Sequence, residues 1–202
     1  MAELPAAAKP YSAASERNRE PILAVLREHF AAVHHALEIG SGTGQHAAYF
    51  AAALPHLVWQ ASDRAPYLGG IRQWLDEAAL PNTPAPIALN VNDAWPALEV
   101  DAVFSANTLH IMGWSEVQRF FAMLPGVLKR GGVLLVYGPF NRGGQPTSEG
   151  NARFDAELRA ANPKRGLRDF DAVTALAGDA GLTLIDDRAM PANNACIAWR
   201  RG

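Results

Sequence analysis

The sequence predicts an α/β fold, with a mostly parallel sheet of seven strands and helices on both faces. From about residue 21 onward, short apolar runs alternate with segments of helical spacing, which is typical of βαβ units. The first apolar run ends at a glycine cluster, Gly40–Gly44, from which a helical segment starts. The connection between the last two apolar runs is too short for a crossover helix, so we expect an antiparallel strand at the C-terminus.

Each expected element comes from one of two patterns along the chain. Apolar runs predict strands at residues 36–39, 57–61, 86–91, 101–106, 133–137, 182–186 and 195–200. Helical spacing or helical composition predicts helices at residues 21–33, 45–54, 66–80, 115–128, 148–161 and 169–180, and the helix at 148–161 is polar. Pro21 marks the first turn of the first helix, and Ser115 and Gln118 form a capping box at the fourth. The glycine-rich stretch after the fifth strand predicts a long loop.

The composition favours a single domain spanning residues 1–202, without nucleic-acid or membrane partners. A chain of 202 residues, 49% of them hydrophobic, is long enough to bury a core. The net charge of -2, with basic runs no longer than pairs, gives no bulk attraction for nucleic acid. The lone Cys196 forms no internal disulfide, and no CxxC pair offers a zinc site, so we predict no metal. Without a signal-like N-terminus or an apolar stretch of about 20 residues, we expect a cytoplasmic protein.

The glycine loop is the most informative segment of the chain. Its glycines let a ligand approach the backbone closely, and the helix that follows presents free N–H groups. A dinucleotide site would show the pattern G-x-G-x-x-G, but Gln45 stands where the third small residue would pack. Glu38, two residues before Gly40, suits an ammonium group and would repel a pyrophosphate. The alternative is a tight turn without a ligand, which is costly after a buried strand.

This pattern, acid-x-Gly-x-Gly-x-Gly, resembles the first motif of class I S-adenosylmethionine-dependent methyltransferases. The resemblance implies that S-adenosylmethionine is the cofactor. It assigns to the cofactor site the residues Glu38, Gly40, Ser41, Gly42, Thr43 and Gly44. We expect His46, in the first turn of the following helix, to contact the methionine moiety.

Two further positions extend the predicted cofactor site. Asp63 lies about 20 residues after the loop, where a carboxylate accepts hydrogen bonds from the ribose hydroxyls, and a plain helix cap is the alternative. At the end of the third strand, the methyltransferase pattern has an Asp that accepts from the adenine amino group, and the next backbone N–H meets the ring. This chain has Asn90 there, followed by Val91. An amide oxygen accepts the same hydrogen bond, so adenine binding is weakened rather than excluded.

The end of the fourth strand favours a small-molecule acceptor. Asn107 and His110 resemble the residues that follow this strand in small-molecule methyltransferases, and we assign Asn107 to the cofactor site. The chain lacks the Asn-Pro-Pro-aromatic tetrapeptide of many methyltransferases that act on nucleic acids and protein glutamine. His110 is the best candidate for a general base, and a pocket-lining histidine that transfers no proton is the alternative.

Nearly the whole chain resembles the domain-of-unknown-function 938 family. The segments that carry this resemblance are residues 11–22, 37–46, 105–111, 138–140 and 190–194. That family is methyltransferase-like, with the Rossmann-like class I fold and no assigned acceptor. The resemblance therefore supports the fold and the cofactor and says little about the substrate.

Two segments lie outside the general fold. Residues 1–20 form a leader that we expect to fold over the cofactor as a lid, through Tyr11, Arg17 and Asn18. A solvated helix face is the alternative for its charged run. Residues 138–180 form an insertion over the sheet edge, which we expect to be the wall of the acceptor pocket. Its candidate wall residues are Arg142, Asn151, Phe154, Arg168, Asp169 and Phe170.

The leading hypothesis is an S-adenosylmethionine-dependent methyltransferase that acts on a small molecule. A non-catalytic S-adenosylmethionine-binding module is the alternative, since Asn90 departs from the usual pattern. An NAD-dependent oxidoreductase is disfavoured by Glu38 and Gln45. The residues predict neither the acceptor nor the oligomeric state.

Overall fold

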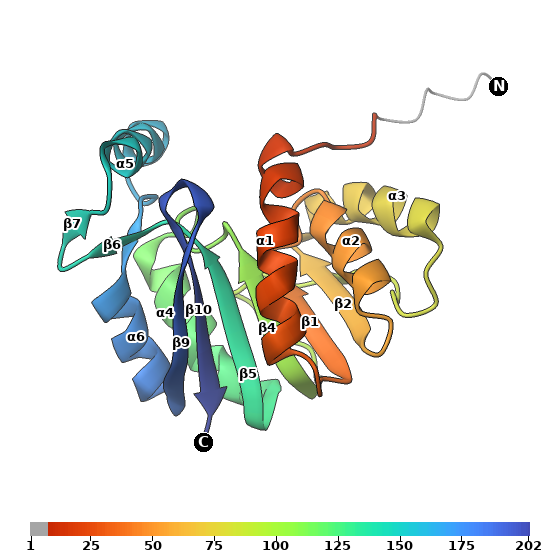
Figure 1. Ribbon diagram of the computed structural model, residues 1–202. Coiled ribbons are helices and arrows are strands. Elements are labelled where there is room, and N and C mark those ends of the chain that lie inside the picture. Colours follow the sequence, from red (N-terminus) through yellow and green to blue (C-terminus); the bar gives the residue numbers. More distant parts are fainter. Residues whose placement is uncertain (1–7) are drawn as a thin grey trace.

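The computed structural model describes residues 8–202, which build a large sheet, a small sheet and the helices around them (Figure 1). The helices are α1 (Ala13–His29), α2 (Gln45–Ala53), α3 (Leu68–Ala78), α4 (Trp114–Met123), α5 (Glu149–Ala161) and α6 (Phe170–Asp179). The strands are β1 (His35–Ile39), β2 (Val58–Asp63), β3 (Ile87–Ala88), β4 (Val100–Ala106), β5 (Leu128–Gly138), β6 (Phe140–Arg142), β7 (Gln145–Pro146), β8 (Arg168–Asp169), β9 (Leu182–Met190) and β10 (Asn194–Arg201).

The large sheet has the strand order β3-β2-β1-β4-β5-β10-β9. Neighbouring strands from β3 to β5 are parallel, and β10 is antiparallel to both β5 and β9. The predicted seven-stranded, mostly parallel sheet with an antiparallel C-terminal strand is therefore confirmed. The chain order reverses between β1 and β4. Their carboxyl ends flank the crevice in which open α/β sheets bind ligands.

Helices cover both faces of the large sheet. Successive residues of β4 point to opposite faces, so Phe104 packs on the face of α1, α2 and α3, while Val103 packs on the face of α4 and α6. The first face buries Trp59 and the second buries Trp199, both fully. No helix in residues 8–202 is long and apolar enough to cross a lipid bilayer.

Helix α1 begins at Ala13, well before the start that Pro21 predicted. Ser12 caps it, with the Ser12 Oγ accepting a hydrogen bond from the backbone N–H of Ser15 at 3.2 Å. The prediction was wrong because the first two turns bury only Asn18, a polar residue, and so show no apolar spacing. Arg17 and Asn18 therefore lie inside the first helix rather than in a leader ahead of it.

The connection from α4 to β5 also differs from the prediction. Pro125 interrupts the helix, which ends at Met123 and passes through a single 3₁₀ turn into a strand that begins at Leu128. The predicted capping box of Ser115 and Gln118 was wrong as well. Glu116 takes that role, because its Oε2 accepts from the N–H of the cap residue Gly113 at 2.6 Å.

Two regions around the third and fifth strands were mispredicted. β3 has only two residues because Asn90 turns the chain, with its backbone carbonyl accepting from Asp93 N and its side-chain oxygen from Asn92 N. The predicted long loop after β5 is a small sheet of order β7-β6-β8. Helix α5 follows β7 and stands at one end of the large sheet (Figure 1).

Truncating Phe104 is expected to destabilise the fold strongly. This ring is fully buried, and its centroid lies 5.5 Å from that of Phe50 and 5.6 Å from that of Trp59. We predict that Phe104→Ala lowers the free energy of unfolding by about 3–5 kcal/mol. Urea denaturation measures the change. The matched control is Leu184→Ala on β9, where the side chain is 38% exposed and the expected loss is below about 1 kcal/mol. Equal losses in the two variants would contradict the burial argument.

Candidate functional site

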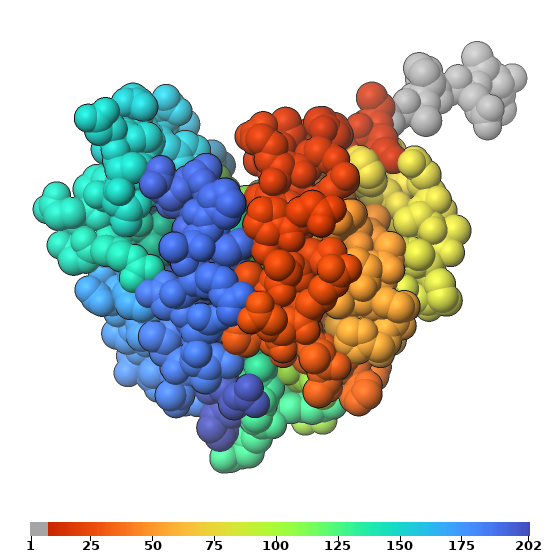
Figure 2. All heavy atoms as spheres, viewed as in Figure 1, coloured from red at the N-terminus to blue at the C-terminus, as the bar shows by residue number. Residues whose placement is uncertain are grey.

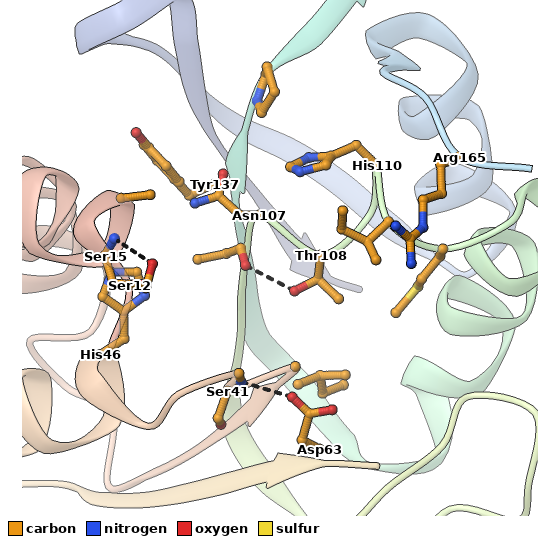
Figure 3. Close-up of a pocket in the computed structure, with 18 of the residues that line it drawn as sticks. Ser12, Ser15, Ser41, His46, Asp63, Asn107, Thr108, His110, Tyr137 and Arg165 are labelled. Carbon is orange, nitrogen blue, oxygen red and sulfur yellow. Dashed lines mark hydrogen bonds between the residues drawn. The ribbon is translucent and has the colours of Figure 1, made fainter. Parts of the chain in front are cut away.

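A cavity of about 1370 Å³ opens at the carboxyl ends of the parallel strands. Ordinary small-molecule pockets measure roughly 300–1,000 Å³, so this cavity has room for two small ligands side by side. Figure 2 shows a notch in the molecular surface at this edge, between α1 on one side and α5 with the β9–β10 turn on the other. Figure 3 shows the interior, with Asp63 at one end and His110 and Arg165 at the other.

The cavity brings together most of the residues that the sequence predicted. Those that line it are Arg17, Asn18, Gly40, Ser41, Gly42, Thr43, His46, Asp63, Asn90, Val91, Asn107 and His110. Of the residues predicted for the cofactor site and the lid, Glu38, Gly44 and Tyr11 do not line it. The position of each of these three residues depends on contacts between distant parts of the chain, which a local sequence pattern does not reveal.

The three loop glycines all have the positive φ angles that favour glycine: 81° at Gly40, 58° at Gly42 and 92° at Gly44. Their surroundings differ. A Cβ on Gly40 would lie 2.6 Å from Thr108 Oγ1, and one on Gly44 would lie 2.8 Å from the Cα of Ile71. A Cβ on Gly42 would meet nothing within 4 Å. Gly40 and Gly44 therefore allow close packing within the protein, while Gly42 presents its backbone to the cavity.

Glu38 lies behind the glycine loop instead of facing the cavity. Its Oε2 accepts hydrogen bonds from Ser41 Oγ at 2.9 Å and from Trp59 Nε1 at 3.0 Å. Burial raises the pKa of Glu38 from 4.5 to about 7, against the lowering effect of these two bonds. The expected direct role of Glu38 beside an ammonium group therefore does not fit its position. Its visible role is to hold Ser41.

Asp63 joins the end of β2 to the glycine loop. Its Oδ2 accepts from the backbone N–H of Gly42 at 2.8 Å, and its Oδ1 accepts from that of Arg64 at 2.7 Å. Burial raises the pKa of Asp63, and these two hydrogen bonds oppose the rise. Each oxygen keeps a further lone pair. A carboxylate with spare acceptor capacity thus lies on the cavity wall beside an open stretch of backbone.

Helix α1 forms a fixed wall of the cavity. His46 Nε2 and Asn18 Oδ1 are 2.7 Å apart, which ties α1 to α2, and both side chains are buried. Burial lowers the pKa of His46 to about 4, so its ring is neutral at physiological pH. Gln45 adds a second tie, because its Oε1 accepts from Ser12 N at 2.5 Å. The structure thus shows why a bulky amide follows the last glycine.

The predicted lid is only partly described. Of residues 1–20, the first seven lie outside the described residues. Pro10 is docked on α3, where its carbonyl accepts from Trp74 Nε1 at 2.7 Å, and Lys9 lies 3.6 Å from the Trp74 ring centroid. Tyr11 is 62% exposed and does not line the cavity. Lys9 and Pro10 are therefore packed against α3, and the chain continues through Ser12 into the α1 wall.

The segment after β4 crosses the middle of the cavity. Asn107 adopts a left-handed conformation with φ of 54°, which asparagine tolerates better than most residues, and its N–H donates to the carbonyl of Tyr137 at 2.8 Å. Thr108 follows, and its Oγ1 donates to Ala106 O at 2.9 Å. Non-glycine residues held in this conformation cluster at functional sites. The strained turn aims the next residues at the cavity.

His110 is the deepest titratable side chain at the far end of the cavity. It is 6% exposed, and its ring contacts that of Phe154 edge to face, with the centroids 5.3 Å apart. Burial lowers its pKa to about 4, and the positive charges of Arg168 and Arg165 contribute. The ring is therefore neutral at physiological pH. It accepts a hydrogen bond readily but holds a transferred proton weakly.

The insertion supplies part of the cavity wall, though fewer residues than predicted. Asn151 and Phe154, both on α5, line the cavity, together with Arg165 after that helix. Arg142 faces away and forms an ion pair with Asp187 on β9. The other predicted wall residues, Arg168, Asp169 and Phe170, do not line the cavity either. Arg168 instead fastens the post-β4 segment by donating to Leu109 O and Met112 O, and helix α6 packs on the sheet.

At the opposite end, Asn90 and Val91 line the cavity beside Asp63. The Asn90 side-chain oxygen accepts from the backbone N–H of Asn92 at 3.1 Å and keeps one lone pair free. The part of the chain that the structure describes contains no group of three or more His, Cys, Asp or Glu residues placed to hold a metal ion.

Tyr137, Ser12 and Arg165 are among the lining residues that the sequence reasoning missed. Tyr137, buried on β5, interacts with Asn18, and burial raises the pKa of its hydroxyl. Ser12 caps α1 at the cavity edge. Arg165 belongs to the basic pair Lys164-Arg165, and the only local sign of a special conformation is the glycine that follows. This residue, Gly166, has a φ of 142°. Each depends on contacts between distant parts of the chain, which one sequence does not reveal.

A family model described as "Protein of unknown function (DUF938)" matches residues 9–201. The chain belongs to the DUF938 family. The match covers every residue that lines the cavity, from the α1 wall to the β9–β10 turn. The predicted family assignment is thereby confirmed.

Several solved structures similar to this DUF938 chain are methyltransferases. An O-methyltransferase family protein from Burkholderia thailandensis is 21% identical, with a TM-score of 0.82, over 94% of this chain and 57% of that one. The mitomycin 7-O-methyltransferase is 19% identical, with a TM-score of 0.82, over 94% and 54%. Human N-acetylserotonin methyltransferase, solved with SAM, is 16% identical, with a TM-score of 0.77, over 94% and 53%. The DUF938 chain thus has the Rossmann-like methyltransferase fold and spans little more than half the length of these proteins.

The different surroundings of Gly40 and Gly42 predict different costs of an added methyl group. Gly40→Ala and Gly42→Ala both place alanine in a left-handed conformation, at about 1–2 kcal/mol. Only Gly40→Ala also drives a Cβ into Thr108, so it is expected to lower the free energy of unfolding further. Urea denaturation of both variants measures the difference. Adding Thr108→Ala to Gly40→Ala should restore part of the loss. No recovery in the double variant would argue against this contact.

The buried carboxyl of Glu38 predicts a pH-dependent stability. The folded chain keeps the Glu38 proton up to about pH 7, whereas the unfolded chain releases it near 4.5. Unfolding therefore releases a proton between these values, and this group's contribution to stability falls as the pH rises through that window. Glu38→Gln keeps an oxygen acceptor for Ser41 and Trp59 without the ionisation. It should match wild type below pH 4.5 and become increasingly more stable than wild type up to about pH 7.

Denaturation curves across this pH range measure the effect, with Glu38→Ala as control. Alanine removes the acceptor as well as the charge, so this variant should be less stable than Glu38→Gln at every pH. A stability difference between Glu38→Gln and wild type that does not change with pH would show that Glu38 ionises normally.

Proposed function

We propose that this protein is an S-adenosylmethionine-dependent methyltransferase whose acceptor is a small molecule. The observation that carries the proposal is the junction between the glycine loop and β2. There the N–H of Gly42 is fixed on the Asp63 carboxylate at 2.8 Å, and no atom lies within 4 Å of a Cβ built on Gly42. A carboxylate and an open backbone surface are thereby offered to the same ligand at the carboxyl edge of the sheet.

The residues at this end fit the proposed cofactor. Asp63 would accept the ribose hydroxyls with its remaining lone pairs, and the loop at Gly40–Gly42 would lie along the methionine moiety. Asn90 and Val91 would meet the adenine with a side-chain oxygen and a backbone N–H. When bound, S-adenosylmethionine supplies a methyl group carried on a positively charged sulfur.

The other end of the cavity suits an acceptor. The cavity volume of about 1370 Å³ accommodates a second molecule, and aligning two reactants accounts for much of the rate enhancement of such enzymes. We propose that neutral His110 accepts a hydrogen bond from the acceptor and orients it. Its pKa of about 4 favours this role over full proton abstraction.

One alternative stays open, a binding module that holds the cofactor without catalysis. Turnover of the cofactor with any acceptor separates it from the enzyme. An NAD-dependent oxidoreductase is disfavoured, because Gln45 occupies the base of the glycine loop with hydrogen bonds to Ser12 and Thr43. No small residue stands there to allow the close packing of helix on strand that a dinucleotide-binding loop needs.

Calorimetric titration with S-adenosylhomocysteine tests the proposed function. We expect wild type to bind with a micromolar dissociation constant, because the ligand presents the ribose and amino acid groups that Asp63 and the loop would hold. Asp63→Ala and Gly42→Val should each weaken binding by about tenfold or more, through loss of a charged acceptor and obstruction of the cavity.

Asp76→Ala is the matched control, since Asp76 is an exposed acid on α3 away from this cavity. It should bind as wild type does, and thermal unfolding should show all variants folded. A wild-type protein that gives neither heat nor thermal stabilisation with S-adenosylhomocysteine, but responds to NADH, would favour the oxidoreductase.

A further inference from the structure

Arg165 is a cation without a partner on the cavity wall. It lies between α5 and β8, and its side chain points into the cavity near His110 and Thr108 (Figure 3). Its Nε is buried and has no hydrogen-bond partner, and its guanidinium forms no ion pair within residues 8–202. A buried N–H group without an acceptor costs free energy. The cost is offset when a ligand supplies the acceptor.

Two acidic residues of this region, Asp155 and Glu116, have other partners and form no ion pair with Arg165. Asp155 on α5 accepts from Arg159 Nε at 2.7 Å and from Leu167 N at 2.6 Å. Glu116 on α4 accepts from Gly113 N and from Asn92 Nδ2. Both carboxylates are therefore engaged elsewhere, and Arg165 keeps its charge available to a ligand.

The other arginine of this region contrasts with Arg165. Arg168 is buried, and it donates to three backbone carbonyls, those of Leu109, Met112 and Lys164. Its role is to fasten two segments together. The side chain of Arg165, three residues earlier, fastens no segment in this way, although its Nε is buried.

The residues around Arg165 indicate the chemistry of the rest of the ligand. Ile111, Met112 and Phe154 give the cavity an apolar wall at this end. His110, which is neutral at physiological pH, adds no charge of its own. A ligand that fits beside Arg165 has an apolar body and an anionic group.

We propose that Arg165 binds a carboxylate of the methyl acceptor, so that the substrate is a small organic acid with an apolar body. This inference rests on the proposed function and names the substrate class of the same site. The planar guanidinium presents paired N–H groups that match the two oxygens of a carboxylate. The acid enters between Arg165 and His110, at the end of the cavity away from Asp63.

Ligand-observed NMR on the complex with S-adenosylhomocysteine tests the inference. The probes are benzoate, phenylacetate and 3-phenylpropionate, each beside the amide of the same skeleton. At least one carboxylate should bind more tightly than its amide. Arg165→Gln should weaken binding of that carboxylate by about tenfold, as expected for loss of a charged hydrogen-bond pair. The affinity for the corresponding amide should stay unchanged.

Arg153→Gln is the matched control, because it removes the same charge from α5 at a side chain that is 72% exposed and outside the cavity. It should leave carboxylate binding unchanged. Equal binding of every carboxylate and its amide, or equal losses in the two arginine variants, would overturn the inference. Phenyl phosphate is added as a further probe. If it alone binds in an Arg165-dependent way, the ligand is a phosphate ester and the carboxylate assignment is wrong.

The affinity for S-adenosylhomocysteine is measured separately for each variant. It should be the same in wild type, Arg165→Gln and Arg153→Gln. A tenfold loss in Arg165→Gln alone would place this arginine in the cofactor site and overturn its role with the acceptor. Failure of wild type itself to bind S-adenosylhomocysteine would instead overturn the proposed function.

Discussion

A buried hydrogen-bond network beneath the glycine loop holds the site in place. Ser62 Oγ donates to the carbonyl of Glu38 at 2.6 Å, and Ser62 O accepts from the backbone N–H groups of Gly40 and Ser41. Ser41 Oγ in turn donates to the Glu38 carboxyl and accepts from Ser62 N at 3.1 Å. These bonds fix the loop to the ends of both β1 and β2. The hydrogen bond between Gly42 N and the Asp63 carboxylate depends on this fixed position of the loop relative to β2.

The network has an energetic cost that the rest of the fold offsets. Burying an acid raises its pKa, and Glu38 sits among apolar side chains with Trp59 as one of its few polar contacts. The aromatic cluster of Phe50, Trp59 and Phe104 surrounds the same region and contributes hydrophobic stabilisation. The packed aromatic cluster thus supports the polar loop from below. The loop conformation is set by contacts within the protein.

The parts of the fold that the sequence predicted well are those with local signals. Parallel strands bring their carboxyl ends to one edge, so the strand pattern and the resemblance to class I methyltransferases together placed Gly42, Asp63 and Asn107 at one site. The α1 wall had no such signal, because the polar residues before Pro21 bury little apolar surface. Pairing of β6 with β8 joins segments far apart in the chain, and nothing in either short run indicates its partner.

Arg165 illustrates the same limit at the site itself. In the sequence it belongs to a short basic pair, Lys164-Arg165, which ordinarily marks a solvated surface. The segment that carries Arg165 is held beside the cavity by two contacts. Gly166 N donates to His110 O at 3.0 Å, and Arg168 Nε donates to Leu109 O in the segment after β4. Burial of the Arg165 Nε is therefore a product of tertiary contacts.

The positions of Arg165 and His110 link binding to basicity at the acceptor end. Burial is the larger cause of the low pKa of His110, and the charges of Arg168 and Arg165 add to it. An acceptor carboxylate paired with Arg165 would cancel one of these two charges, while Arg168 stays committed to backbone carbonyls. The pKa of His110 would then rise part of the way toward its ordinary value, because the burial contribution remains. His110 would therefore accept a proton more readily once an anionic acceptor is in place, and the neutral ring of the free protein would be poised for that change.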